Sequence, residues 1–107
     1  MKPGQRIGAI CGTKGNVVEI FGFGVYEGAF PIGDDAVGAV ADMAREVSEE
    51  EGEPLLNPRL RLDSGQVVWG CECWWGAEAK VREQIVGMTI VEVDIDKVRK
   101  SVERSGE

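Results

Sequence analysis

Two apolar runs of β-type composition near the N-terminus are separated by turn residues, and this pattern predicts a β-hairpin. Residues 6–12 and 17–21 both have the apolar, β-branched composition that is typical of strands. Residues 12–16, between them, supply the small and polar side chains of a turn. Residues 22–28 then place glycines between bulky side chains, which predicts a strand bend or bulge where another backbone can approach closely.

Apolar residues change to a helical spacing over residues 35–48, and this stretch predicts one inserted helix. Asp34 or Asp35 is suited to cap its N-terminus, where a carboxylate also interacts well with the helix dipole. The glutamates at 49–51 would oppose that dipole, so we expect residues 48–54 to form a solvated loop.

A second hairpin is predicted where residues 60–62 and 67–69 flank a short turn that contains a glycine. Continued alternation extends its second strand to residue 75. Such a strand would place four side chains on one face, namely Trp69, Cys71, Cys73 and Trp75.

The C-terminal third predicts a short helix, a strand and a helical tail. Ala77, Val81 and Ile85 share a helical face, and Glu78 and Arg82 are spaced to pair at i,i+4. Alternation over residues 89–95 predicts a strand, after which Asp96 is expected to cap a last helical segment.

These elements predict an α+β fold in a single domain over residues 1–107. Most strands follow one another through hairpins, so the sheet of about five strands should be mainly antiparallel. We expect it to be strongly curved or to form a small open barrel, with the helix of residues 35–48 packed against it and short helices at the C-terminal end.

Charge and composition narrow the classes of function. The chain has a net charge of −7, and residues 1–53 alone carry four Lys or Arg against ten Asp or Glu. An acidic protein of this kind is not expected to bind nucleic acid, where phosphate neutralisation by cations dominates affinity. No apolar run approaches the roughly 20 residues that a membrane helix needs. The odd count of three cysteines favours a reducing compartment, and no signal-peptide core follows Met1, so we expect a cytoplasmic protein.

The cysteines are the first candidates for chemistry. Cys71 and Cys73 are one residue apart, and Cys11 could add a third sulfur ligand. Zinc sites usually separate paired cysteines by two to four residues and need a fourth ligand, and the chain has no histidine. We therefore expect no metal and no cofactor, and interpret Cys71 and Cys73 as small buried apolar residues between Trp69 and Trp75.

Clustered tryptophans are the most unusual feature. All three lie between residues 69 and 75, and alternation sends Trp74 and Trp75 to opposite faces. An exposed aromatic ring beside a carboxylate suits a peptide, a cationic group or a partner protein. The alternative is that helices cover both rings. The predicted binding residues are Tyr26, Glu27, Glu72, Trp74 and Trp75.

Strand carboxylates offer a third possibility. Five acidic residues on predicted strands could converge on one face, namely Glu19, Glu27, Glu72, Glu92 and Asp94. Paired carboxylates perform acid–base chemistry when a pocket shifts their pKa values. Without histidine the chain lacks the commonest general base, so we interpret these acids as solvated.

Three segments resemble parts of small uncharacterised proteins that are carried by mobile genetic elements, meaning phage genomes and integron gene cassettes. The segments are residues 8–12, 20–28 and 67–76. The resemblance implies a cytoplasmic accessory protein that acts on a host factor, and it implies no particular activity or functional residue.

The leading hypothesis is therefore a non-enzymatic interaction module that presents an aromatic and acidic surface to a protein partner. One alternative is a domain that binds a small molecule or a peptide on a concave sheet. Another is a small enzyme that uses strand carboxylates. A homodimer that covers the tryptophans is also compatible with the sequence.

Overall fold

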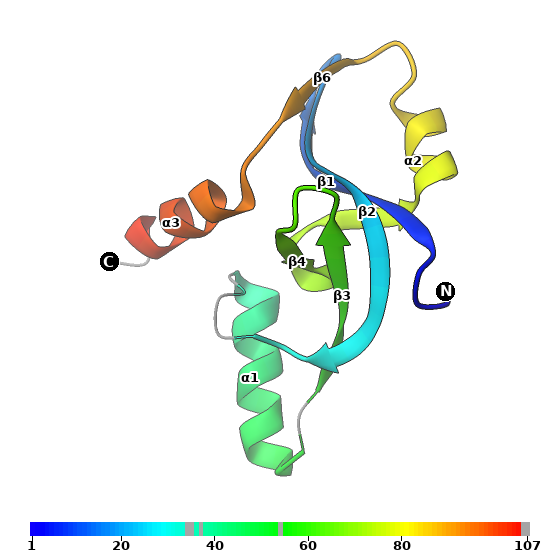
Figure 1. The fold of residues 1–107 in the computed structure, drawn as a ribbon. Coiled ribbons are helices and arrows are strands. Elements are labelled where there is room, and N and C mark those ends of the chain that lie inside the picture. The colour runs from blue at the N-terminus through cyan, green and yellow to red at the C-terminus, as the bar shows by residue number, and fades with distance from the viewer. Residues whose placement is uncertain (34–35, 37, 54, 106–107) are drawn as a thin grey trace.

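The computed structural model describes residues 1–33, 36, 38–53 and 55–105. These residues form one strongly curved, mainly antiparallel sheet that is not closed into a barrel, with helices around it (Figure 1). The predicted α+β class and open, curved sheet are confirmed. The described residues hold six strands where the sequence predicted about five.

The strands are β1 (Arg6–Lys14), β2 (Val17–Pro31), β3 (Leu56–Leu62), β4 (Val67–Trp69), β5 (Trp74–Ala77) and β6 (Thr89–Glu92). The helices are α1 (Ala39–Glu51), α2 (Glu78–Gln84) and α3 (Ile95–Ser105), and a 3-10 turn, η1, covers Gly70–Glu72. The sheet order is β4-β3-β2-β1-β5, and β6 pairs with the first part of β2. That last pairing is parallel, whereas all the others are antiparallel.

β2 is the centre of the sheet, and its bend confirms the expectation from the glycines. Its first part pairs with β1 and its second part with β3, with a register shift between Tyr26 and Gly28. Gly28 has a φ of 115°, which few other residues adopt. At Gly24 the backbone of β3 comes so close that a Cβ atom would lie 2.0 Å from the carbonyl oxygen of Arg61.

Apolar side chains gather in three small clusters, because β2 sends alternate residues to opposite faces of the sheet. Phe21 belongs to the main cluster, where β1, β3 and β4 meet the start of α3, while Ile20 belongs to a second cluster beneath α2. The third lies where Trp69 meets Ala41 of α1. The buried residues of the main cluster are Ile7, Ala9, Phe21, Leu60, Leu62, Val68 and Ile95.

The inserted helix exists, but its predicted bounds are wrong. α1 begins at Ala39, after Gly38 with a φ of 106°, and continues through Glu49–Glu51 to an αL cap at Gly52. The three glutamates are exposed, where the unfavourable dipole interaction is small and their helix propensity prevails. The predicted caps, Asp34 and Asp35, lie outside the described residues, as does Val37 on the predicted apolar face.

The long strand predicted up to residue 75 is also wrong. The hairpin of β3 and β4 forms as predicted, but η1 interrupts the second strand after Trp69. The carboxylate of Glu72 accepts a hydrogen bond from the Trp69 backbone N–H at 3.0 Å, which closes this turn. Trp69 and Cys71 consequently pack in the cluster beneath α1, whereas Cys73 and Trp75 pack on the main cluster, so the four do not share a face.

The predicted short helix is confirmed as α2, with Val81 and Ile85 buried and Arg82 Nε 3.3 Å from Glu78 Oε2. β6 ends at Glu92, three residues earlier than predicted, and its side chains are exposed. Asp94, rather than Asp96, caps α3, because its Oδ1 accepts the Asp96 backbone N–H at 2.9 Å. Figure 1 shows α2 and α3 on opposite sides of the molecule.

Candidate functional site: a groove at the sheet edge

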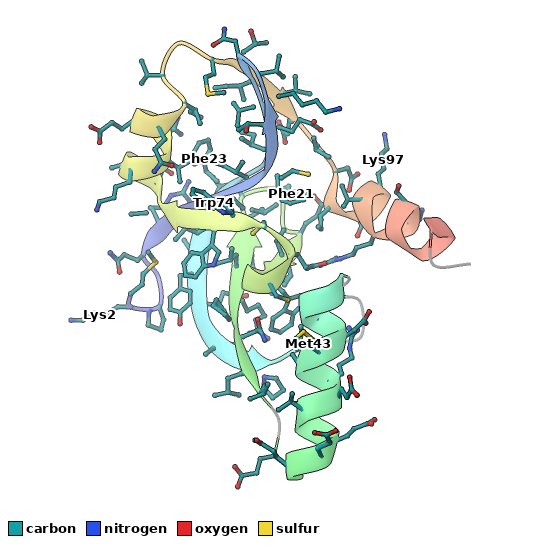
Figure 2. All side chains as sticks on the ribbon, turned by 180° about the vertical axis from the view of Figure 1, so that it is seen from behind. Lys2, Phe21, Phe23, Met43, Trp74 and Lys97 are labelled. Carbon is teal, nitrogen blue, oxygen red and sulfur yellow. The ribbon has the colours of Figure 1, made fainter. Side chains whose placement is uncertain are left out.

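Trp74 is the most exposed aromatic side chain of the predicted site. It opens the edge strand β5 opposite Ile10 of β1, and 70% of its surface is exposed. Trp75, its neighbour, points to the other face of the strand and stacks on Tyr26, with ring centroids 5.6 Å apart. The prediction that the two indoles diverge is confirmed. Figure 2 shows Trp74 on the strand that leads into α2.

An apolar hollow of about 290 Å³ lies beside Trp74. A smaller one of about 110 Å³ adjoins it along α2, and the two share Ile10, Trp74 and Gln84. We call the pair the Trp74 groove. Its lining is Ile10, Cys11, Gly12, Thr13, Trp74, Trp75, Gly76, Ala77, Lys80, Val81, Gln84, Ile85 and Met88.

The groove exists because β5 is shorter than the strand it pairs with. β5 covers β1 only from Ile7 to Ile10, because η1 delays its start to Trp74. β1 continues to Lys14, paired on its other side with β2. α2 crosses above, and the turn that follows it contributes Ile85 and the half-buried Met88. The result is an apolar depression over the end of β1, with the Trp74 indole at its border.

The charge of the groove differs from that of the whole protein. Lys80 lines it, Lys14 ends the strand beneath it, and the described lining residues include no carboxylate. Both lysines are exposed, and neither makes a hydrogen bond or ion pair within the described part of the chain. The described residues that line the groove thus carry one positive charge and no negative charge in a protein with a net charge of −7, while Glu19 of β2 pairs with Gly12 on the other side of β1.

Glu72 does not lie on this surface, and its predicted exposure to a partner is wrong. Its side chain is 1% exposed and bonded to Arg99, with distances of 2.7 Å to Nη2 and 2.9 Å to Nε. This pair joins α3 to η1. Buried carboxylates need such partners because an unpaired charge loses its hydration without compensation.

The other predicted binding residues do not form one surface with Trp74 either. Glu27 binds Arg59 and Arg61, each at 3.0 Å, so its charge is already compensated within the sheet. Tyr26 is held against Trp75 at the main cluster. Of the five predicted binding residues, Trp74 and Trp75 line the groove. No pattern in the sequence marked Ile10, Ile85 and Met88 as site residues, because only the tertiary packing of β1 against α2 and the turn after it brings these distant segments together.

Three of the five strand carboxylates have separate partners and do not form a catalytic pair with one another. Glu27 and Glu72 bind different arginines, while Asp94 accepts hydrogen bonds from the Gln66 side chain and the start of α3. These hydrogen bonds lower the pKa of Asp94, the opposite of the raised pKa that a general acid needs. Within the described residues, no group of three Cys, Asp or Glu has the arrangement of a metal site.

The predicted burial of Cys71 and Cys73 is only partial, since both are half-buried, and Cys11 is exposed. Partial burial still makes Cys73 a poor nucleophile, and this leads to a first prediction. Burial raises the pKa of the Cys73 thiol to about 12 and also raises the pKa of Cys71 and Cys11. At about pH 8 a free thiol is partly ionised, whereas Cys73 is almost entirely protonated. We expect Ellman's reagent to react with Cys73 at least tenfold more slowly in the native protein than in guanidinium, as measured by peptide mapping. Equal rates would contradict this burial.

A second prediction concerns tryptophan emission. Trp69 is 5% exposed and Trp75 is stacked, so Trp74 should account for most of the emission that iodide can quench. Trp74→Phe is expected to abolish most of this accessible fraction in a Stern–Volmer titration. The control, Trp69→Phe, should leave it in place. Strong iodide quenching that persists in Trp74→Phe would contradict the assigned exposure.

Comparisons with known proteins leave the site to be interpreted from its geometry. No family model, curated protein or solved structure matches this chain. None of the helices in the described residues has the length and apolar character required to cross a membrane.

Proposed function

We propose that this protein is a non-enzymatic interaction module whose Trp74 groove binds a segment of a partner protein. The observation that carries the proposal is the exposed Trp74 indole at the border of an apolar hollow. Burying a side chain of this size contributes about 2 kcal/mol, and tryptophan is enriched among the residues that dominate binding energy at protein interfaces. The rigid sheet and α2 hold the groove ready before binding, which reduces the entropy lost on association.

A small-molecule site is the second candidate, because the hollow is apolar. Its volume of about 290 Å³ is at the lower end of ligand pockets, and it opens along a strand edge. An elongated chain segment matches this shape better than a compact ligand does. The half-buried stack of Tyr26 on Trp75 and the paired Glu27 contribute to the fold rather than to the proposed contact.

The proposal also retains the setting that the sequence suggests. Three unpaired cysteines favour the cytoplasm. The resemblance to proteins of mobile genetic elements favours an accessory role toward a host protein. A partner protein, rather than nucleic acid, fits the net charge of −7.

Selection of binding peptides tests this function and is the third prediction. The immobilised protein is expected to enrich specific members of a displayed library of random peptides. The enriched peptides should lose about tenfold or more in affinity for Trp74→Ala, measured by fluorescence anisotropy. The matched control is Val86→Ala, because Val86 is 78% exposed but does not line the groove. A library without enriched binders, or binders that are indifferent to Trp74→Ala, would overturn the proposal.

A further inference from the structure

The Trp74 groove lies over an unpaired strand edge. Residues Gly12 to Lys14 pair with Glu19 to Val17 of β2 on one side. On the other side, β5 ends its pairing at Ile10, and no strand of the described residues follows it. Backbone groups that point away from β2 in this stretch therefore have no strand partner. An edge of this kind can accept a further strand through main-chain hydrogen bonds.

The hollow lies where the side chains of such a strand would point. Alternate residues of an added strand face the same side of the sheet, and on this side Ile10, Ile85 and Met88 form an apolar surface beneath α2. Trp74 is the first residue of β5, and it borders the position where the added strand would continue the line of β5. An apolar side chain of the added strand would thus be enclosed between the indole and α2.

Charge indicates the chemistry of the occupant. Lys14 and Lys80 are the charged residues at the strand end and in the groove, and both lack an anionic partner within the described residues. A carboxylate at either end of an added strand would compensate them, whereas a basic segment would be repelled. A lysine at an open edge also hinders pairing between copies of the same chain, and Lys14 lies at this place.

We propose that the occupant is an extended segment of another protein with alternating apolar residues and flanking acidic residues, and that it adds to β1 as a strand along Cys11–Lys14. This inference rests on the proposed function. It adds the backbone conformation and the charge of the bound segment, and it assigns Lys14 and Lys80 as the residues that favour a segment with acidic side chains.

The same enriched peptides test this inference with two separate readouts. We expect them to alternate apolar residues and to carry Asp or Glu at their ends. Methylation of backbone nitrogens that face β1 should weaken binding about tenfold or more, while methylation of the alternate nitrogens should change it little. The double substitution Lys14→Glu and Lys80→Glu should reduce affinity about tenfold, whereas Lys97→Glu, on α3 far from the groove in Figure 2, should not.

Each failure has a distinct meaning. The enriched peptides could depend on Trp74 but be basic, or they could tolerate methylation at every nitrogen. Either result would overturn the proposal of an added acidic strand, while the proposed interaction module would remain supported. Peptides that do not depend on Trp74 would overturn both. Light scattering could instead show that the protein is a dimer and that Trp74→Lys makes it monomeric. This result would identify a second copy as the occupant of the groove and overturn the proposed partner segment.

Discussion

Replacing Gly24 with alanine is expected to lower the free energy of unfolding by about 3 kcal/mol or more. The added Cβ would lie 2.0 Å from the Arg61 carbonyl oxygen and 2.6 Å from the Leu62 Cα atom. Both atoms belong to the backbone of β3, so no change of rotamer can relieve the contact, and the two strands must separate. The pairing of β2 with β3 supports the main apolar cluster, which makes this separation costly.

Urea unfolding followed by circular dichroism measures this effect against a matched control. Gly12→Ala also places a methyl group on a strand glycine, but its Cβ would meet no atom within 4 Å. We expect Gly12→Ala to change stability by less than about 0.5 kcal/mol. If Gly24→Ala unfolds at the urea concentration of the wild type, the close approach of β2 and β3 is incorrect.

Replacing Glu72 with alanine is expected to cost about 3 kcal/mol, because it leaves the Arg99 guanidinium buried without its main carboxylate. Arg99 is 8% exposed and donates two hydrogen bonds of 2.9 Å or less to the Glu72 carboxylate. The substitution also removes the acceptor for the Trp69 backbone N–H, which holds η1. Docking of α3 and the start of β5 should both weaken.

The measurement is again the midpoint of urea unfolding, with Asp96→Ala as the control. Asp96 also approaches Arg99, at 3.6 Å, but its side chain is 62% exposed, so its loss should cost less than about 0.5 kcal/mol. The double variant Glu72→Leu and Arg99→Leu should recover part of the loss, because neither charge then remains buried alone. Equal effects of Glu72→Ala and Asp96→Ala would show that burial of the pair has no energetic weight.

Local sequence signals predicted the parts of the fold that depend on neighbouring residues. The hairpin of β1 and β2, the hairpin of β3 and β4, and α2 all follow from periodicity and turn residues. The close approach at Gly24 was predictable for the same reason, since a glycine between bulky strand residues has few other uses. These features need no knowledge of which distant segments meet.

The wrong predictions for the strand up to residue 75 and for Glu72 depended on contacts between distant segments. η1 interrupts a run that alternates well, because Glu72 is drawn inward by Arg99, 27 residues later in the chain. The parallel pairing of β6 with β2 leaves no local sign in either strand. For the site, alternation correctly predicted that Trp74 and Trp75 point to opposite faces. The same alternation placed Glu72 on the surface, because a local pattern contains no information about its buried partner, Arg99.

Amide chemical-shift mapping would show directly whether the Trp74 groove is the binding surface. The ¹⁵N-labelled protein would be titrated with an enriched peptide. We expect the largest shifts on residues 10–14 of β1, on Trp74, and on the lining residues of α2 and the turn after it, which are Lys80, Val81, Gln84, Ile85 and Met88. Shifts concentrated instead on the exposed apolar patch around Met43 and Leu56, with the groove unchanged, would contradict it.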